Sequence, residues 1–420
     1  MITTLNIERF KSLRKLSIEL GTVNVFIGPN GSGKTAILEA LGLIGCACTG
    51  HVDDSGLLER GVRPGVSSLF VSGFPEIGRD SSICVETKAT INGEKVSYSI
   101  ELDQPDDASG RYWRFLKESV GHIGLRGFPQ DGPEPPEYGD KYTGLAPRVL
   151  SDRSCPPDAR TLLSNLADYV LYSPNTPSLR GTTPDYRQRP PVGLEGGRLA
   201  EPVQALKQFY ETHPEVYPLD EYIDLLDWVS PMGVGAMAPS ALLLSPSVPS
   251  TTLTVGFTDR FMDESRHLLT AYDASEGALY VLLLAVLALH PGVPPIFAID
   301  NFDQALNPRL ARAVTKLLVD HIIAGTDEPQ NGKRFYNEAS PPPEKRHRRQ
   351  VLLTTHSPQV LDGLDISRDD VRLFAVDRNS KGETAVRRIV IDEKVLREAE
   401  SGVTLSRLWV MGRLGGVPNV

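Results

Sequence analysis

The sequence has few cysteines, no excess of positive charge and no long apolar run. Its four cysteines are Cys46, Cys48, Cys84 and Cys155. They are too few for a disulfide framework in a 420-residue chain, and their spacing is not that of a zinc site. The net charge of −9 excludes a polycationic nucleic-acid coat. The longest apolar run, 278–289, is shorter than the roughly 18 residues that cross a bilayer. We therefore expect a cytoplasmic protein with reduced thiols and no membrane partner.

Glycine and proline are abundant instead, with 37 and 33 residues. Twelve prolines lie between Pro129 and Pro191. This composition is typical of shaped loops or of partial disorder. We expect 1–103 and 251–420 to be two halves of one α/β unit, separated by an inserted loop- and helix-rich lobe at 104–250. Within the first half, Asn92-Gly93 between two alternating segments predicts a β-hairpin and therefore an antiparallel lobe.

The clearest motif is Gly28-Pro29-Asn30-Gly31-Ser32-Gly33-Lys34-Thr35, which fits G-x-x-x-x-G-K-[ST]. It lies between a predicted apolar strand at 23–27 and a predicted helix at 35–44. Glycines let backbone N–H groups approach phosphates, and the helix N-terminus adds a favourable dipole. We expect Lys34 to reach the β- and γ-phosphates and Thr35 to bind Mg²⁺. The candidate nucleotide-binding residues here are Asn30, Gly31, Ser32, Gly33, Lys34 and Thr35.

A carboxylate follows the apolar segment 295–299. A P-loop site needs such a strand, ending in an acidic residue, to hold Mg²⁺ through its water shell. Many buried strands end in aspartate, so this pattern is weak when it stands alone. Together with the P-loop it makes Asp300 the expected second Mg²⁺ ligand beside Thr35.

Two further segments carry candidate residues. Ser275 and Gly277 stand at the start of the apolar helix at 278–289, and His356 follows a predicted strand at 351–355. Alone, a Ser-x-Gly before a helix is usually an N-cap, and a histidine after a strand is usually structural. In the order P-loop, Ser275, Asp300 and His356, however, they resemble the signature, Walker B and switch-histidine motifs of ABC-type ATPases.

The chain as a whole resembles the ABC-type AAA ATPases of the RecF/OLD-like group, which are relatives of the SMC head domains. The opening Leu5-x-Ile7-x-x-Phe10-Lys11-Ser12-Leu13 and Asn24 are similar to the group's N-terminal pattern, and Leu306-Asn307-Pro308 occupies the place of its Leu-His-Pro. The resemblance covers 1–100 and 250–391 well and the middle only loosely. It implies a P-loop NTPase of the ABC-ATPase type, with ATP and Mg²⁺ as cofactors.

The resemblance also implies a homodimer or higher oligomer that sandwiches ATP between protomers. Ser275 and Gly277 of one protomer would contact the γ-phosphate bound to the other, and His356 would contact the γ-phosphate as well. Such ATPases commonly serve genome maintenance or antiphage defence. We expect a separately encoded effector protein as partner, since too little chain follows His356 for the nuclease domain of the OLD type.

The sequence departs from the group's pattern at the catalytic base. The acidic residue expected after Asp300 is Asn301, a neutral amide that cannot accept a proton from water. Hydrolysis should therefore be slow or should use another carboxylate, for which Asp303 is the nearest candidate. Alternatively, Asp303 caps the next segment or serves the dimer interface. We also find no convincing Q-loop glutamine at 50–100, and Gln104 is the nearest one.

These observations predict an ATP-driven switch that acts on an effector, with antiphage defence as the favoured setting and RecF-like DNA repair or recombination as the alternative. A transporter motor is disfavoured because a whole lobe separates Thr35 from Ser275. DNA remains a possible partner: the basic run Lys345–Arg349 could contact phosphates, although a solvated loop is the commoner explanation of such a run.

Overall fold

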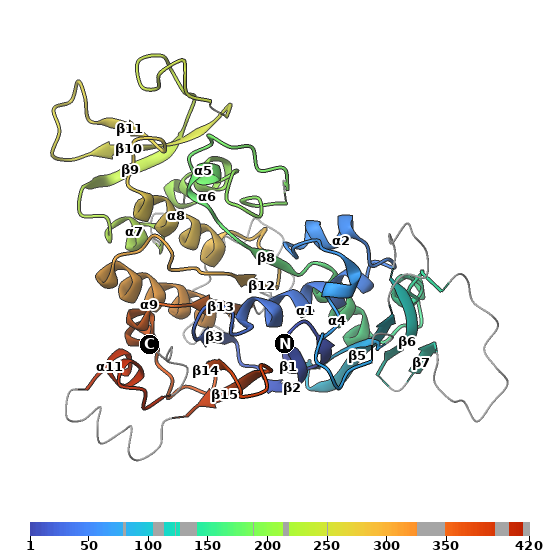
Figure 1. Ribbon diagram of the computed structural model, residues 1–420. Helices are drawn as coiled ribbons and strands as arrows, with labels where there is room; N and C mark the ends of the chain where they lie inside the picture. Colours follow the sequence, from blue (N-terminus) through green and yellow to red (C-terminus); the bar gives the residue numbers. More distant parts are fainter. Residues whose placement is uncertain are drawn as a thin grey trace.

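The computed structural model describes residues 1–78, 81–103, 113–121, 123–126, 141–187, 189–212, 218–249, 251–325, 349–390 and 403–414. In these ranges the chain forms two six-stranded sheets and one three-stranded sheet, with helices packed between and around them (Figure 1). This confirms the predicted α/β class with an antiparallel lobe.

The central sheet has the strand order β15-β14-β3-β13-β12-β8. Its strands are β3 (Val23–Ile27), β8 (Val170–Tyr172), β12 (Ile296–Ile299), β13 (Gln350–Thr355), β14 (Val371–Arg378) and β15 (Thr384–Ile389). The strands from β14 to β8 are parallel, and β15 pairs antiparallel with β14. All residues of β3, β8, β12 and β13 are buried, as in parallel sheets covered on both faces. The strands predicted at 23–27, 295–299 and 351–355 are thus confirmed.

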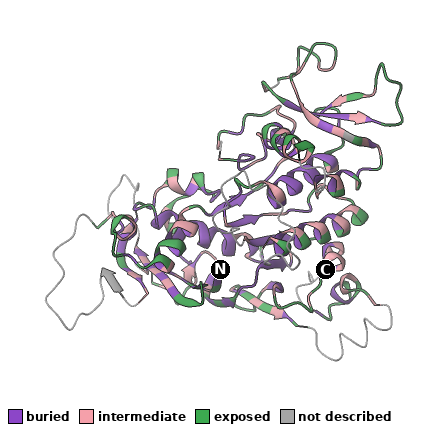
Figure 2. Ribbon diagram, turned by 180° about the vertical axis from the view of Figure 1, so that it is seen from behind, coloured by how far each residue is buried: buried purple, intermediate pink, exposed green. Residues whose placement is uncertain are grey.

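The central sheet separates two hydrophobic cores. Side chains of β3 alternate between them, since neighbouring residues of a strand point to opposite faces. Val25 packs into one core with the helices α8 (Glu276–Leu289) and α9 (Pro308–Ala324). Phe26 packs into the other core with α1 (Lys34–Ala47) and the antiparallel sheet. Helix α8 is buried over most of its length, as its uninterrupted apolar sequence predicts (Figure 2).

The antiparallel sheet has the order β2-β1-β4-β5-β6-β7. Its strands are β1 (Ile2–Phe10), β2 (Leu13–Glu19), β4 (Ile83–Ile91), β5 (Glu94–Asp103), β6 (Arg114–Val120) and β7 (Ile123–Arg126). The predicted hairpin joins β4 to β5, and its two turn residues, Asn92 and Gly93, have φ of 53° and 87°. Positive φ at both positions is what a two-residue hairpin turn of this twist requires.

A third, smaller sheet of order β11-β10-β9 stands apart from the central sheet at the top of Figure 1. It consists of β9 (Val229–Met237), β10 (Thr254–Asp259) and β11 (Leu268–Thr270). Further helical segments are α2 (Asp54–Glu59), η1 (Ser67–Leu69), α3 (Ala146–Ser151), α4 (Pro157–Ala167), α5 (Thr176–Leu179), α6 (Ala200–Thr212), α7 (Pro218–Ile223), η2 (Pro358–Gly363) and α11 (Leu405–Val410).

The segment 104–250, expected as an inserted lobe, contributes to all three sheets. It supplies β6 and β7 to the antiparallel sheet, β8 to the central sheet and β9 to the small sheet. The expected boundaries at 103 and 250 therefore pass through sheets, because the proline-rich composition changes inside structural units and not between them.

Candidate nucleotide-binding site

The P-loop joins β3 to α1, which begins at Lys34. Gly31 and Gly33 have φ of 74° and 108°, a left-handed region that residues with a Cβ rarely adopt. A Cβ at Gly28 would overlap the carbonyl oxygen of Val376, so this glycine permits close packing of the loop against β14. The loop therefore turns tightly and presents backbone N–H groups at the N-terminus of α1, as anion binding requires.

The Lys34 side chain lies folded over this loop. Its Nζ donates hydrogen bonds to the carbonyl oxygens of Gly28 (2.7 Å) and Pro29 (2.9 Å) and lies 3.3 Å from Nδ1 of His356. Burial lowers the pKa of Lys34 to about 8, although the carboxylates of Asp300 and Asp303 act in the opposite direction. The ammonium group is thus held against the loop that the motif predicts to bind phosphates.

The two predicted Mg²⁺ ligands lie side by side. The Thr35 hydroxyl is 3.0 and 3.2 Å from the two carboxylate oxygens of Asp300. Thr354, at the end of β13, also hydrogen-bonds Asp300 through its hydroxyl. The backbone N–H of Asp300 donates to the carbonyl of Tyr172 (2.9 Å), which fixes the end of β12 against β8. A hydroxyl and a carboxylate held this close offer suitable oxygen ligands for one hard cation.

Asn301 adopts a left-handed backbone conformation, with φ of 52°. Its N–H donates to the Thr354 hydroxyl at 2.8 Å, so the same threonine orients Asp300 and Asn301. Asparagine tolerates this conformation better than most residues. The backbone therefore favours an asparagine at this position, independently of any role in the chemistry.

Asp303 belongs to the same cluster. It is only 9 % exposed. Burial raises its pKa, while hydrogen bonds from the Thr355 side chain and the Ser357 backbone, and the charge of Lys34, act in the opposite direction. A buried carboxyl with a raised pKa has the property that a general base needs.

His356 contacts the P-loop from β13. Its Nδ1 lies 3.1 Å from the carbonyl oxygen of Gly28. Burial and the neighbouring Lys34 lower the pKa of His356, which favours the neutral ring. In the neutral ring Nδ1 donates to Gly28 if it carries the proton and accepts from Lys34 if it does not, so the two contacts belong to different tautomers.

Ser275 and Gly277 lie on a separate part of the surface. Ser275 is exposed and caps α8, accepting a hydrogen bond from the N–H of Ala278 at 3.3 Å. Among the described residues, no hydrogen bond joins it or Gly277 to the P-loop. Within the described residues, the structure thus brings Lys34, Thr35, Asp300, Asp303 and His356 together, while the signature residues make no hydrogen bond to them.

Residues 172–180, which carry no recognised motif, connect the cluster around Asp300 to the signature residues. Beyond Tyr172, which holds Asp300, the carbonyl of Pro174 accepts a hydrogen bond from Tyr280 of α8 (3.0 Å). Arg180 then donates to the carbonyl of Ala274 at 3.3 Å, one residue before the signature serine. The sequence around this arginine carries no signal of a role. Only the short apolar triplet at 170–172 signals a strand here.

The basic run lies mostly outside the described residues, as does Gln104. Its last member, Arg349, donates hydrogen bonds to the carbonyls of Ala288 and His290 at the C-terminal end of α8. A guanidinium at this position satisfies carbonyls that the helix leaves unpaired. Arg349 is therefore a structural cap.

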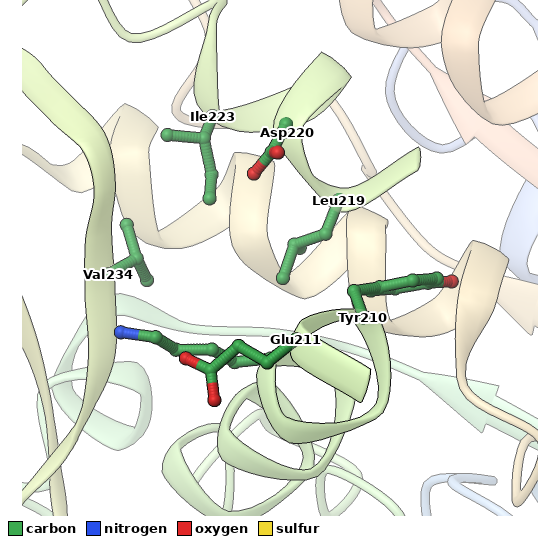
Figure 3. Close-up of a pocket in the computed structure, with 7 residues that line it drawn as sticks. Tyr210, Glu211, Leu219, Asp220, Ile223 and Val234 are labelled. Carbon is green, nitrogen blue, oxygen red and sulfur yellow. The ribbon is translucent and has the colours of Figure 1, made fainter. Parts of the chain in front are cut away.

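A cavity of about 50 Å³ lies between α6, α7 and β9 (Figure 3). Tyr210, Leu219 and Ile223 line it, and none of the motif residues does. Sites for drug-sized ligands usually measure about 300–1,000 Å³, so this cavity is too small for a nucleotide. In the described residues, no cluster of three or more His, Cys, Asp or Glu side chains forms a metal site, and no helix has the length and apolarity to cross a membrane.

The pKa of Lys34 predicts how nucleotide affinity depends on pH. Below pH 8 the side chain is charged in the free protein, and phosphates would raise its pKa further. Above pH 8 the free protein loses the proton that the complex retains, so the Kd for ATP should rise by up to about tenfold per pH unit. Calorimetric titrations at pH 7, 8 and 9 measure this. Lys34→Arg, which stays charged, should bind more weakly but with little pH dependence; a wild-type Kd that is unchanged up to pH 9 would contradict the expectation.

Two family models match the chain. One, described as "AAA domain, putative AbiEii toxin, Type IV TA system", matches residues 197–362, and the other, described as "AAA domain", matches residues 4–119. The first therefore covers Ser275, Asp300 and His356, and the second covers the P-loop.

Curated relatives are similar over shorter stretches. The DNA replication and repair protein RecF of Vibrio cholerae serotype O1 is 40 % identical over 73 residues, which are 17 % of this chain and 19 % of the relative. RecF of Acinetobacter baylyi is 33 % identical over 105 residues, 24 % of this chain and 28 % of the relative. The matches thus span well under a third of these proteins.

A solved structure of the SmcHead bound to the C-winged helix domain of ScpA is similar in fold. It has a TM-score of 0.52 and 14 % identity, and the match covers 94 % of this chain and 99 % of that one. At this identity the similarity concerns the fold, and it extends over nearly the whole chain.

Proposed function

We propose that this chain, an ABC-type AAA ATPase of the RecF/SMC-like group, is a slow ATP-operated switch that dimerises around ATP and acts on a partner. The observation that carries the proposal is the convergence of five residues from three segments of the chain: the start of α1, the turn after β12 and the end of β13. Lys34, Thr35, Asp300, Asp303 and His356 meet at the P-loop through hydrogen bonds and charge interactions.

The residues fit ATP with Mg²⁺. Lys34 would exchange the carbonyls of Gly28 and Pro29 for phosphate oxygens, and the N–H groups of the loop would hold the same phosphates. Thr35 and Asp300 would open to admit the cation between them. Bound Mg²⁺ neutralises charge on the phosphates, and the protein supplies the position.

The exposed signature supports dimerisation. A serine hydroxyl and a helix N-terminus on the surface are donors suited to an anion, and in one protomer they do not reach its own P-loop. Two chains placed face to face would each offer Ser275 to the nucleotide held by the other. Asp300 is connected to α8 through Tyr172 and Pro174. This connection would then couple the nucleotide bound by one protomer to the Ser275 that the same protomer offers to its partner.

We further propose that turnover is slow because Asn301 occupies the position of the expected base. A neutral amide can orient water without accepting its proton. Asp303 is a buried carboxyl with a raised pKa in the same cluster, and it would serve as the base of the residual reaction.

The biological setting is proposed as antiphage defence with a separately encoded effector. The description of the matching family as a putative toxin of a type IV TA system supports a role of this kind. The alternative is DNA repair or recombination, supported by the similarity to RecF, a DNA replication and repair protein. Purification of the native complex distinguishes the two: a protein effector favours the first and bound DNA favours the second.

Ser275→Arg tests the dimer. We expect the mass of the wild-type chain in solution to double on addition of ATP and Mg²⁺, whereas the variant stays a monomer because the long charged side chain blocks the interface. ATP affinity of the variant should stay within about threefold, since Ser275 does not contact its own P-loop. Light scattering coupled to gel filtration measures the mass of the wild type and of the variant, and calorimetric titration measures their affinity for ATP. Ser247→Arg, at another exposed serine, is the matched control and should dimerise. A Ser275→Arg variant that dimerises with ATP would refute this arrangement.

A further inference from the structure

The C-terminal hairpin of β14 and β15 contacts the back of the P-loop, and the motifs assign no role to it. Thr384, the first residue of β15, is 7 % exposed. Its hydroxyl donates a hydrogen bond to the carbonyl oxygen of Ser32 at 2.7 Å. Arg378, the last residue of β14, donates from Nε to the carbonyl oxygen of Gly31 at 2.8 Å. Two consecutive P-loop carbonyls are therefore held by residues about 350 positions away in the chain.

Ser12 extends this arrangement. Its hydroxyl lies 2.8 Å from that of Thr384, and its carbonyl accepts the N–H of Thr384 at 2.9 Å. Thr384 has one hydroxyl proton, which it donates to Ser32, so Ser12 must be the donor to Thr384. The result is a chain of two hydrogen bonds, in which Ser12 donates to Thr384 and Thr384 donates to Ser32 of the P-loop. It gives a structural reason for the serine in the N-terminal segment Phe10-Lys11-Ser12-Leu13.

The contacts have a defined effect on the phosphate-binding groups. In a planar trans peptide the C=O and N–H groups point in opposite directions. Holding the carbonyls of Gly31 and Ser32 on the outside of the loop therefore directs the N–H groups of Ser32 and Gly33 to the inside. The N–H of Ser32 makes only a long contact of 3.3 Å with the carbonyl of Pro29. Donors fixed before the ligand arrives bind it without a further ordering cost.

The P-loop and the C-terminal hairpin are closely packed against each other. A Cβ on Gly33 would overlap the Thr384 hydroxyl, so the loop and the hairpin are in direct contact at this point. The Arg378 side chain is also tied to its own hairpin, because it hydrogen-bonds the carbonyl of Gly382. An exposed arginine is thereby fixed in one orientation towards the loop.

From these contacts we infer that Thr384 and Arg378 are positioning residues that preorganise the P-loop for phosphate binding, and that Ser12 supports Thr384. The inference rests on the proposed ATP-binding function. It adds that the strength of phosphate binding is set in part by the C-terminal hairpin, so a movement of the hairpin would change nucleotide affinity.

Thr384→Val tests the inference, because valine keeps the shape and removes the hydroxyl. We expect the Kd for ATP with Mg²⁺ to rise about tenfold, the usual effect of one lost hydrogen bond at a binding site. Pyrophosphate, which offers only phosphate groups, should lose the same factor as a competitor. Thr384→Ser should restore affinity to within about twofold of the wild type. The control is Thr90→Val, at an exposed threonine of β4. Melting temperatures measured in parallel separate a loss of stability from a loss of affinity.

The outcomes are distinguishable. If the wild type fails to bind ATP, the proposed function fails. If it binds ATP and Thr384→Val binds equally well, or if Thr384→Ser is as weak as Thr384→Val, the inference is overturned. If Thr384→Val does not fold, the exposed Arg378→Ala takes its place, with Arg388→Ala as control. A three- to fivefold weaker Kd for Arg378→Ala alone supports the inference, and an unchanged Kd overturns it.

Discussion

Replacing Lys34 by alanine should raise the Kd for ATP by about two to three orders of magnitude, since removing one partner of a close charge interaction costs several kcal/mol. The Nζ of Lys34 lies against the carbonyls of the P-loop, and the motif predicts that it reaches the β- and γ-phosphates. Isothermal titration at pH 7 measures the effect, and the variant should then also lack ATPase activity and ATP-dependent dimers.

The matched control for this variant is Lys381→Ala. Lys381 is an exposed lysine in the turn between β14 and β15, so its loss removes one positive charge near the site without removing a predicted phosphate contact. It should bind ATP within about twofold of the wild type. Circular dichroism would show that Lys34→Ala is folded. A folded Lys34→Ala protein with near-wild-type affinity would place the nucleotide elsewhere.

Changing Asn301 to glutamate should raise kcat at least tenfold. A correctly placed general base contributes about a hundred- to ten-thousandfold, and part of this gain would be lost because glutamate tolerates the left-handed backbone at this position less well. Steady-state phosphate release at saturating ATP measures the change. Asn301→Ala should remain as slow as the wild type, because the amide it removes is not a base.

Asp303→Asn completes the comparison. If Asp303 is the base of the residual reaction, this variant should reduce kcat at least a hundredfold while its Kd for ATP changes little. In the background of Asn301→Glu, the same substitution should have a smaller effect because the new carboxylate has taken over the role. Rapid wild-type hydrolysis that Asn301→Ala alone abolishes would contradict slow switching.

Much of the fold could be predicted because its signals are local. Strand β12 before Asp300 is a short apolar run, and β3 is apolar apart from Asn24. Helix α8 is apolar from Ala278 onwards, and Asn92-Gly93 favours the positive φ angles that its turn requires. The P-loop residues were also accessible, since glycines at positive φ and an adjoining lysine follow from the chemistry of phosphate binding.

What could not be predicted depends on contacts between distant parts of the chain. Strand β8 has only three residues and becomes recognisable as a strand through its pairing with β12. Arg180 contacts Ala274 and Thr384 contacts Ser32, and each pair is far apart in the sequence, so no local pattern indicates these contacts. Strand β10 extends over Thr254–Asp259, and its register is set by its pairing with β9.

The most direct test of the proposed switch follows the dimer through one round of hydrolysis. Wild-type protein is mixed with a stoichiometric amount of ATP and Mg²⁺, and light scattering and phosphate release are recorded on the same sample. The switch predicts that dimers form on mixing and dissociate with the rate constant of hydrolysis, and that Asp303→Asn prolongs their lifetime. Hydrolysis without dimers, or dimers that persist long after the ATP is consumed, would contradict it.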